Sequence, residues 1–322
     1  MSKRTNEPIA TWQEGDLVQG FALVRRREVR QDRNGRDYLD LTLADASGAI
    51  PAKAWSDSPA LSQSFGAGDY VAFVGTVQSY RETPQMKLDN CRKVVEEDRL
   101  RGFDEARLIP TTKEDIDDLW RRLTRIYREE VVRPELVRLA AETLDALGAE
   151  LREHPAAKSI HHAYRGGLLE HTVSMAELAL AVTGHYRDVD RDLVLLGVLF
   201  HDLGKLRELA PMPDNDYTLP GRLVGHVVIG RDLLKERAAA IPDFPADLLL
   251  LLEHLVLSHQ GKKEFSSPVE PMTFEAFVLH FIDDLDSKLA QLRAARDTGS
   301  GFVYLRPLER FVYLGAGEGD AD

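Results

Sequence analysis

The spacing of hydrophobic residues divides the chain into two stretches. Over residues 16–95 apolar and polar positions alternate with the period of two that is typical of strands, as in YLDLTL at 38–43. The pair Asn34-Gly35 before this run predicts a hairpin turn. Further strands are expected at 49–55 and 70–80, with one or two helical turns between them. This order predicts a small five-stranded β-barrel of the OB type.

Residues 113–296 instead follow the helical period, with Pro and Gly residues marking helix ends. Thr112, followed three residues later by Asp115, predicts a capping box at the first helix. The fold class is therefore multidomain α and β, a small OB-type barrel followed by an all-α domain. The expected parts are an N-terminal extension (1–13), an OB-fold nucleic-acid-binding domain (14–96), a linker (97–112), the all-α domain (113–300) and a C-terminal segment with a flexible acidic tail (301–322).

Composition narrows the class of protein. With 322 residues, 43% of them hydrophobic and 29% charged, the chain is long enough for two domains with real cores. No apolar run is long enough to cross a bilayer, and residues 1–12 lack the apolar core of a signal peptide. We therefore expect a cytoplasmic protein that does not bind membranes. The single cysteine, Cys91, excludes an internal disulfide and is most simply a small buried residue.

The charge pattern restricts nucleic-acid binding. Nearly all of the net charge of −12 comes from the second part of the chain, since residues 1–100 hold 14 Lys and Arg against 15 Asp and Glu. Such a chain is a poor sequence-independent binder of duplexes, but a local groove for single strands is allowed. Arg25 and Arg27 belong to a basic run in the barrel, and Tyr38 and Trp55 are candidates for stacking on bases. The alternative for each aromatic residue is a place in the barrel core.

Candidate chemistry lies in the helical part. All ten histidines fall between His154 and His280, and the pair His201-Asp202 ends an apolar run that is expected to be buried. A buried polar pair needs partners, which divalent metal ions would provide. Lys205, three residues after Asp202, is placed to contact a phosphate oxygen; alternatively it is only a charge at a helix end.

Further metal-binding residue types follow along the chain, at His226, His254, His259 and the pair Asp283-Asp284. Imidazoles with few carboxylates suit Mn, Fe, Co, Ni or Zn better than Mg, and Mn is the first expectation. Two ions would activate a water and hold the oxygens of a phosphoryl group, a reaction that needs no nucleophilic side chain. The alternative is a helical bundle whose histidines hold no metal.

At these residues the chain resembles the HD-domain metal-dependent phosphohydrolases, whose His…His-Asp…Asp signature is here His171, His201-Asp202 and Asp283. The string HHAYRGGLLEHT at 161–172, the segments 219–226 and 257–259, and their place behind an OB-type barrel resemble more narrowly the YhaM family of 3'-5' exoribonucleases. The resemblance covers about residues 14–300. It implies a helical domain that binds divalent metal ions and hydrolyses phosphodiesters.

The resemblance also implies roles for particular residues. By position, it assigns four residues to a first metal ion, with Asp202 bridging to a second: His171, His201, Asp202 and Asp283. His226 and His259 would hold the second ion. Helical spacing does not choose between Asp283 and Asp284, so that choice depends on the resemblance.

One departure concerns the second ion. Members with a full dinuclear site commonly carry another His directly after the one matching His259, where this chain has Gln260. We expect a weaker second site, with His254 as a less favoured ligand. His161 and His162 are expected to hydrogen-bond substrate or the second ring nitrogen of a ligand.

The function expected is hydrolysis of single-stranded RNA, with single-stranded DNA as a further candidate, from the 3' end to nucleoside 5'-monophosphates. His201, Asp202 and Lys205 are the expected catalytic residues, and the substrate-binding candidates are Lys205, His162, Arg25, Arg27, Tyr38 and Trp55. Two alternatives stay open: a phosphohydrolase of free nucleotides or cyclic dinucleotides, and a non-catalytic protein that binds single strands. The sequence is also compatible with a homo-oligomer.

Overall fold

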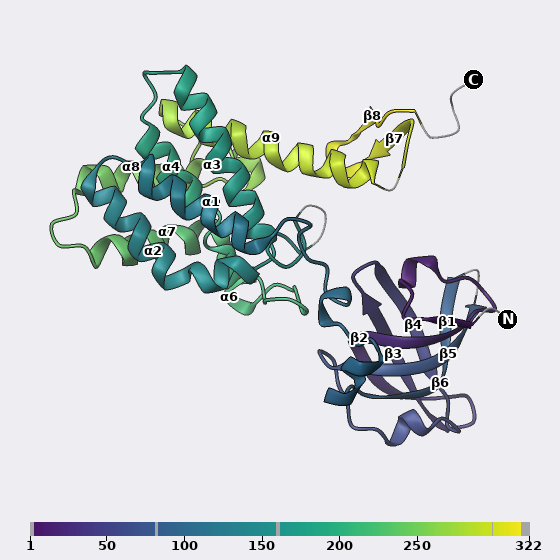
Figure 1. Cartoon of the computed structure of the whole chain (residues 1–322). Helices are drawn as coiled ribbons and strands as arrows, with labels where there is room; N and C mark the ends of the chain where they lie inside the picture. Colours follow the sequence, from purple (N-terminus) through teal and green to yellow (C-terminus); the bar gives the residue numbers. More distant parts are fainter. Residues whose placement is uncertain (1–2, 81–82, 159–161, 298, 317–322) are drawn as a thin grey trace. The chain divides into compact units, whose positions relative to one another are not determined.

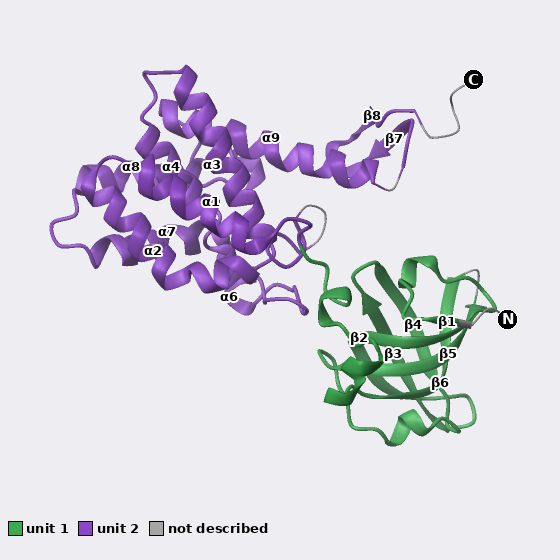
Figure 2. Ribbon diagram, in the orientation of Figure 1, with its two compact units in different colours: residues 1–111 green, residues 112–322 purple. Residues whose placement is uncertain are grey.

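The computed structural model describes residues 3–80, 83–158, 162–297 and 299–316. The chain forms two compact units, residues 1–111 and residues 112–322 (Figure 2). Each unit has its own hydrophobic core, and each is described separately below.

The first unit is a closed β-barrel (Figure 1). Strand β2 pairs with β3 through its second half and with β5 through its first half, which closes the sheet in the order β2-β3-β4-β6-β5. Strands β4 and β6 are parallel, and the other neighbours in the barrel are antiparallel. The predicted OB-type barrel is thus confirmed. Its strands are β2 (Leu17–Gln31), β3 (Asp37–Asp45), β4 (Gly48–Ala54), β5 (Tyr70–Tyr80) and β6 (Thr83–Lys93).

Alternation along β3 builds the barrel core, since Leu39, Leu41 and Leu43 are fully buried. The N-terminal residues join the barrel, because β1 (Lys3–Thr5) pairs in parallel with β2. Residues after β6 are also attached to it through the 3-10 turn η3 (Glu96–Arg101), where buried Asp98 accepts two hydrogen bonds from Arg92. The segment expected as a linker therefore packs partly on the barrel.

The second unit is helical, as predicted. Its central helix is α4, in which residues 192–200 are all buried, because the run is apolar on nearly every side. The described helices are α1 (Ile116–Glu129), α2 (Pro134–Glu153), α3 (Gly167–His185), α4 (Arg191–Phe200), α5 (Lys205–Glu208), α6 (Leu219–Val224), α7 (His226–Ala239), α8 (Ala246–Ser258) and α9 (Phe274–Arg296).

The predicted capping box at Thr112 is wrong. Helix α1 begins at Ile116, and its cap is Asp115, whose carboxylate accepts a hydrogen bond from the Asp118 N–H. The Thr112 hydroxyl instead donates to Glu170 on α3, so a tertiary contact outweighs the local capping pattern.

After α9 the chain forms a short hairpin of β7 (Phe302–Leu305) and β8 (Arg310–Tyr313) (Figure 1). The last six residues, expected to form a flexible acidic tail, lie outside the described residues. Among the described residues, every helix is too short or too polar to traverse a lipid bilayer.

Candidate metal centre

Five helices carry the predicted metal-binding side chains to one place. His171 lies in the second turn of α3, and His201 and Asp202 follow the buried helix α4. His226 begins α7, and His259 directly follows α8. Asp283 lies in the middle of α9. Since α4 is in the core, the residues that follow its end, His201 and Asp202, lie in the interior, where they are 0% and 4% exposed.

The first group of side chains surrounds the Oδ2 atom of Asp202. This atom lies 3.6 Å from Nε2 of His171 and 3.4 Å from Nε2 of His201, and those two nitrogens are 3.3 Å apart. Oδ1 of Asp283 lies 3.4 Å from Nε2 of His171. Ligands about 2.1 Å from one metal ion stand about 3.0–3.4 Å from each other, so the group fits a divalent ion after small adjustments.

The second group faces the other oxygen of the same carboxylate. Nε2 of His226 lies 3.5 Å from Oδ1 of Asp202, and Nε2 of His259 lies 4.0 Å from it. Among the described residues, this buried Oδ1 has no hydrogen-bond partner. A buried carboxylate oxygen without a donor is unfavourable unless a cation is bound to it. The two carboxylate oxygens of Asp202 therefore face two separate groups of residues that could hold metal ions.

Gln260 completes the second group in place of a further histidine. Its Nε2 lies 3.0 Å from Nε2 of His259 and 3.4 Å from Nε2 of His226. The side-chain amide thus occupies the space beside both imidazoles, where its oxygen is the atom that would face a cation if the amide turned over.

The outward ring nitrogen of each of the four imidazoles contacts an oxygen acceptor. Nδ1 of His171 lies 2.8 Å from Oδ2 of Asp286, and Nδ1 of His226 lies 3.0 Å from Oε1 of Glu208. The backbone carbonyl oxygen of Val198 lies 2.9 Å from Nδ1 of His201, and that of Val256 lies 2.7 Å from Nδ1 of His259. A proton held on Nδ1 leaves the Nε2 lone pair free to bind metal, so these contacts select the ligand form of each ring.

Sequence reasoning did not identify Asp286 and Glu208. Asp286 is 4% exposed and also accepts a hydrogen bond from Ser174. Its signal in the sequence is weak: an acidic residue one turn after Asp283 on the buried face of α9. Glu208 has no comparable signal, because its role depends on the approach of α5 to the start of α7.

Burial and neighbouring charges shift the pKa values of two histidines in this centre in opposite directions. Burial lowers the pKa of His259 to about 3, and the neighbouring His201 adds to this effect, so His259 is neutral. Burial also opposes the charged form of His171, but its hydrogen bonds to Asp283 and Asp286 outweigh burial and raise the pKa to about 10. A divalent ion bound here would take the place of the proton on His171.

Lys205 lies at the wall of this centre. Its Nζ is 2.6 Å from Oδ2 of Asp202. Burial acts to lower the pKa of Lys205, but the Asp202 charge outweighs it and raises the pKa, so the ammonium stays charged. Both residues line a cavity of about 380 Å³ that also includes Tyr217 and Lys158 at its rim. The Tyr217 ring is 43% exposed, with Lys158 Nζ 5.8 Å from its centroid.

The cavity continues past the metal centre. A second cavity, of about 710 Å³, shares Gln260, Asp283 and Ser287 with the first and extends along α9 past Lys288. Metal-binding side chains line both cavities, which together are named here the groove: Asp202 and His226 line the first, His259 lines the second, and Asp283 lines both.

The remaining predicted residues of the helical unit lie elsewhere. The structure brings Asp283, not Asp284, to the cluster, and Asp284 instead pairs with Lys288 at 2.6 Å. Nε2 of His254 accepts a hydrogen bond from the Met272 N–H at 3.0 Å and lies outside the metal-binding groups. His162 lies behind His171, 3.7 Å from Asp286, and contacts the Tyr164 hydroxyl. His161 falls outside the described residues.

In the barrel, the predicted stacking residues lie together. The Tyr38 and Trp55 rings are 4.9 Å apart, and Nζ of Lys53 lies 5.5 Å from the Tyr38 centroid. Arg25 is exposed. Arg27, however, lies opposite Leu41 in the β2–β3 pairing and rests over the Phe65 ring, so its side chain is on the core side. The structure therefore does not bring Arg27 to the face of Tyr38 and Trp55.

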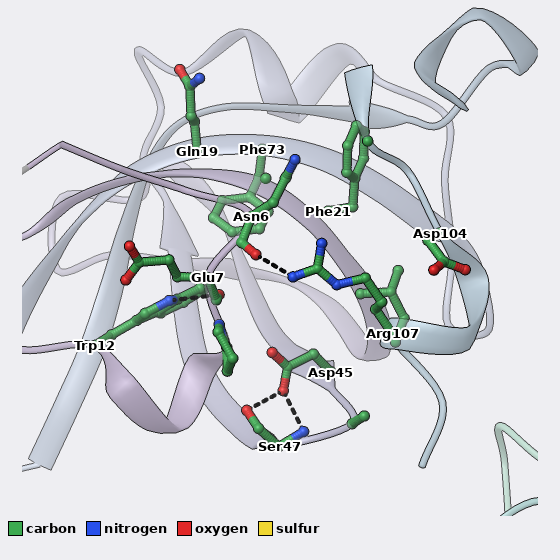
Figure 3. A pocket seen from close by; sticks show the side chains of 15 residues that line it. Asn6, Glu7, Trp12, Gln19, Phe21, Asp45, Ser47, Phe73, Asp104 and Arg107 are labelled. Atoms are coloured by element: carbon green, nitrogen blue, oxygen red, sulfur yellow. Dashed lines mark hydrogen bonds between the residues drawn. The ribbon is translucent and has the colours of Figure 1, made fainter. Parts of the chain in front are cut away.

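A separate hollow of about 240 Å³ lies beside the N-terminal residues of the barrel unit (Figure 3). The Arg107 guanidinium donates to the Asn6 carbonyl at 2.9 Å, and the Trp12 indole donates to the Glu7 carbonyl at 3.1 Å. The hydrogen bond from Arg107 to Asn6 helps to hold the N-terminal residues on the barrel unit.

Comparison with known proteins gives two family matches. The family described as "HD domain" matches residues 168–288, and the family described as "OB-fold nucleic acid binding domain" matches residues 21–94. These ranges lie within the helical unit and the barrel unit, respectively.

Individual relatives match most of the chain. It is 36% identical over 289 residues to the 3'-5' exoribonuclease YhaM of Bacillus pumilus, which covers 89% of this chain and 90% of the relative. The Bacillus subtilis protein of the same name is 36% identical over 281 residues, covering 87% and 88%. Among solved structures, the HD domain of the L. monocytogenes phosphodiesterase PgpH covers 52% of this chain and 76% of its own at 18% identity, with a TM-score of 0.27.

Proposed function

This chain belongs to the YhaM family of 3'-5' exoribonucleases, and from that premise we propose that it degrades single-stranded RNA at the Asp202 centre. The observation that carries the proposal is the position of Asp202, whose two carboxylate oxygens face two separate groups of imidazoles inside a groove. Single-stranded DNA fits the same groove chemistry and is proposed as a second substrate.

The residues divide between two ions. We assign His171, His201, Asp202 and Asp283 to the first ion, and Asp202, His226 and His259 to the second. When bound, two divalent ions supply the Lewis acidity that activates water and stabilises charge on phosphoryl oxygens. Mn is our first candidate, ahead of Fe, Co, Ni, Zn and Mg, because imidazole and carboxylate ligands together suit it.

The reaction is hydrolysis of the last phosphodiester bond. The oxygen of water bonds to phosphorus while the bond to O3' of the preceding nucleotide breaks. That O3' gains a proton and the water loses one, so a nucleoside 5'-monophosphate leaves and the shortened strand keeps a 3'-hydroxyl. Lys205, held by Asp202 at 2.6 Å, donates a hydrogen bond to a non-bridging oxygen as its charge grows.

Tyr217 is proposed as the stacking platform for the terminal base. Tyr217 lines the cavity beside the metal centre. Nζ of Lys158 lies 5.8 Å from the centroid of its ring, and the Arg222 guanidinium lies 5.5 Å from it. An exposed aromatic ring with cations beside it suits a base and its phosphate. This arrangement recognises a nucleotide without selecting a particular base.

The barrel is proposed to hold the strand upstream of the cleaved bond. Tyr38 and Trp55 supply stacking surfaces, and Lys53 lies within 5.7 Å of both ring centroids and 5.5 Å from that of Tyr80. Base stacking with a nearby cation is how sequence-tolerant binding of single strands is achieved. Since the Arg27 side chain is on the core side, we leave it out of this surface.

The test is hydrolysis of a short 5'-labelled single-stranded RNA in Mn²⁺, compared with the same RNA blocked at its 3' end. The proposal predicts a ladder that shortens from the 3' end, release of 5'-monophosphates, and protection of the blocked RNA. Mononucleotides and cyclic dinucleotides are assayed in parallel. Intact RNA together with hydrolysis of those small substrates would contradict the proposal in favour of a small-nucleotide phosphohydrolase.

A further inference from the structure

The exposed phenylalanines of this chain are concentrated in one region. Six of its twelve phenylalanines are exposed, between 49% and 76%, and all six lie between residues 265 and 311. They belong to α9, to the loop before it and to the hairpin after it: Phe265, Phe274, Phe277, Phe281, Phe302 and Phe311. A single exposed apolar residue needs no explanation, but a continuous group of large ones marks an interaction surface.

Helix α9 is apolar on two opposite faces. One face packs in the core through Ala276, Leu279 and Ile282. The other face is an exposed stripe at spacings of three and four residues, which runs for about 22 Å along the helix. Its members, named here the α9 stripe, are Phe274, Phe277, Phe281, Leu285 and Leu289. A helix that is apolar on both sides is expected to be buried on both sides.

The C-terminal hairpin presents a second apolar face. Phe302 pairs with Tyr313 and Tyr304 with Phe311, with ring centroids 5.1 Å apart in each pair. Residues that alternate along paired strands share one face, so the four rings form one surface, and each is at least 51% exposed. A two-stranded hairpin alone is marginal in water and needs packing to be stable.

We propose that a second copy of this chain covers the α9 stripe and the hairpin face. Nine side chains, seven of them aromatic, each with about half of roughly 150–250 Å² exposed, give about 800 Å² of apolar surface. This is about what each partner buries in a stable interface.

Two features favour a second copy over another protein. The hairpin needs a cover in every folded molecule, and another copy of the chain is the partner always present in equal amount. The stripe also has opposite charges at its two ends, with Glu270 before it and Arg293 and Arg296 after it, all exposed. Two stripes packed antiparallel around a two-fold axis bring these opposite charges together.

The interface does not use the metal centre. Phe281 and Asp283 are two residues apart on α9, so their side chains point about 200° apart around the helix. Association through the stripe therefore leaves Asp283 with the metal-binding residues. This makes the proposal independent of the proposed nuclease function, since either can fail without the other.

The test is the molar mass of the full chain, measured by sedimentation equilibrium over a wide range of concentration. We expect twice the 36.1 kDa of one chain for the wild type. The double variant Phe277→Glu/Phe281→Glu, and separately the hairpin variant Phe302→Ser/Phe311→Ser, should sediment as single chains. Leu223→Glu, which changes an exposed leucine on α6, is the matched control and should keep the wild-type mass.

Circular dichroism of each variant separates loss of association from loss of fold. A wild-type protein that sediments as a single chain at every concentration overturns the proposal. So does a folded stripe variant with the wild-type mass. If both variants unfold, the wild-type mass still decides, because a single chain contradicts a covered hairpin.

Discussion

Oδ2 of Asp286 lies 2.8 Å from Nδ1 of His171, although 115 positions separate the two residues. This contact joins α9 to α3 and fixes the ring so that Nε2 faces Asp202 and Asp283. Carboxylates that hold a metal-binding histidine in this way commonly matter for metal affinity.

Replacing Asp286 with Asn should weaken binding of the first metal ion about 10–100-fold, because the amide holds the His171 ring less firmly. Calorimetric titration of the metal-free protein with Mn²⁺ measures this affinity. The matched control is Asp284→Asn, since Asp284 is on the same helix but pairs with Lys288. Equal affinity of the two variants would mean that Asp286 has only a structural role.

A substitution at Gln260 is expected to strengthen metal binding rather than weaken it. Gln260→His should raise occupancy of the second ion, because an imidazole binds transition metals better than a neutral amide. The metal-to-protein ratio after dialysis, determined by mass spectrometry, should rise toward two for the variant. Gln291→His, at the far part of the same groove, is the control and should leave the ratio unchanged. An unchanged ratio in Gln260→His would show that this position is not next to an ion.

Trp55→Ala should weaken binding of single-stranded RNA by about 1–3 kcal/mol, the usual contribution of one stacked base. Fluorescence anisotropy with a labelled oligonucleotide in the presence of chelator measures binding without hydrolysis. Tyr186→Ala, which removes an exposed aromatic ring from the helical unit, is the control. If Trp55→Ala binds as tightly as this control, the barrel face is not the strand-binding surface.

Acid should destabilise the barrel through Asp98. Hydrogen bonds from Arg92, at 2.7 Å each, outweigh the burial of Asp98 and lower its pKa from 3.8 to about 2. Since the folded value is below the unfolded one, Asp98 stabilises the barrel above about pH 4, and this contribution is lost as pH falls toward 2.

Asp98→Asn should therefore lower the free energy of unfolding by about 2 kcal/mol at neutral pH, with a difference from wild type that shrinks below pH 4. Urea unfolding at several pH values measures it. The control is Glu96→Gln, because Glu96 and Arg99 are both exposed and such pairs contribute little. A difference that stays constant with pH would exclude ionisation of Asp98 as the cause.

The order and spacing of the metal-binding residues could be predicted from the sequence, because His201-Asp202 ends a strongly apolar helix and His171 begins another. The alternation in β3 likewise predicts the barrel. Other features depend on contacts between distant segments. In the sequence, nothing distinguishes Asp286 and Glu208 from other acidic residues, because only tertiary packing places them beside His171 and His226.

At two further positions, contacts between distant segments determine what the local sequence pattern does not reveal. The choice of Asp283 over Asp284 depends on how α9 is rotated against α3, which spacing within one helix does not reveal. The basic run predicts that Arg27 binds substrate, but the irregularity in the β2–β3 pairing between Val24 and Arg26 sets the register that places Arg27 opposite Leu41. A bulge of this kind leaves no clear mark in the sequence.

The most direct test of the central claim is the effect of Asp202→Asn on the 3'-end shortening of single-stranded RNA in Mn²⁺, with metal content measured on the same samples. The variant should lose most of its bound metal and nearly all of its activity while it keeps its fold and its RNA binding. A variant that is folded and shortens RNA at a rate near that of the wild type would contradict the bridging role of Asp202.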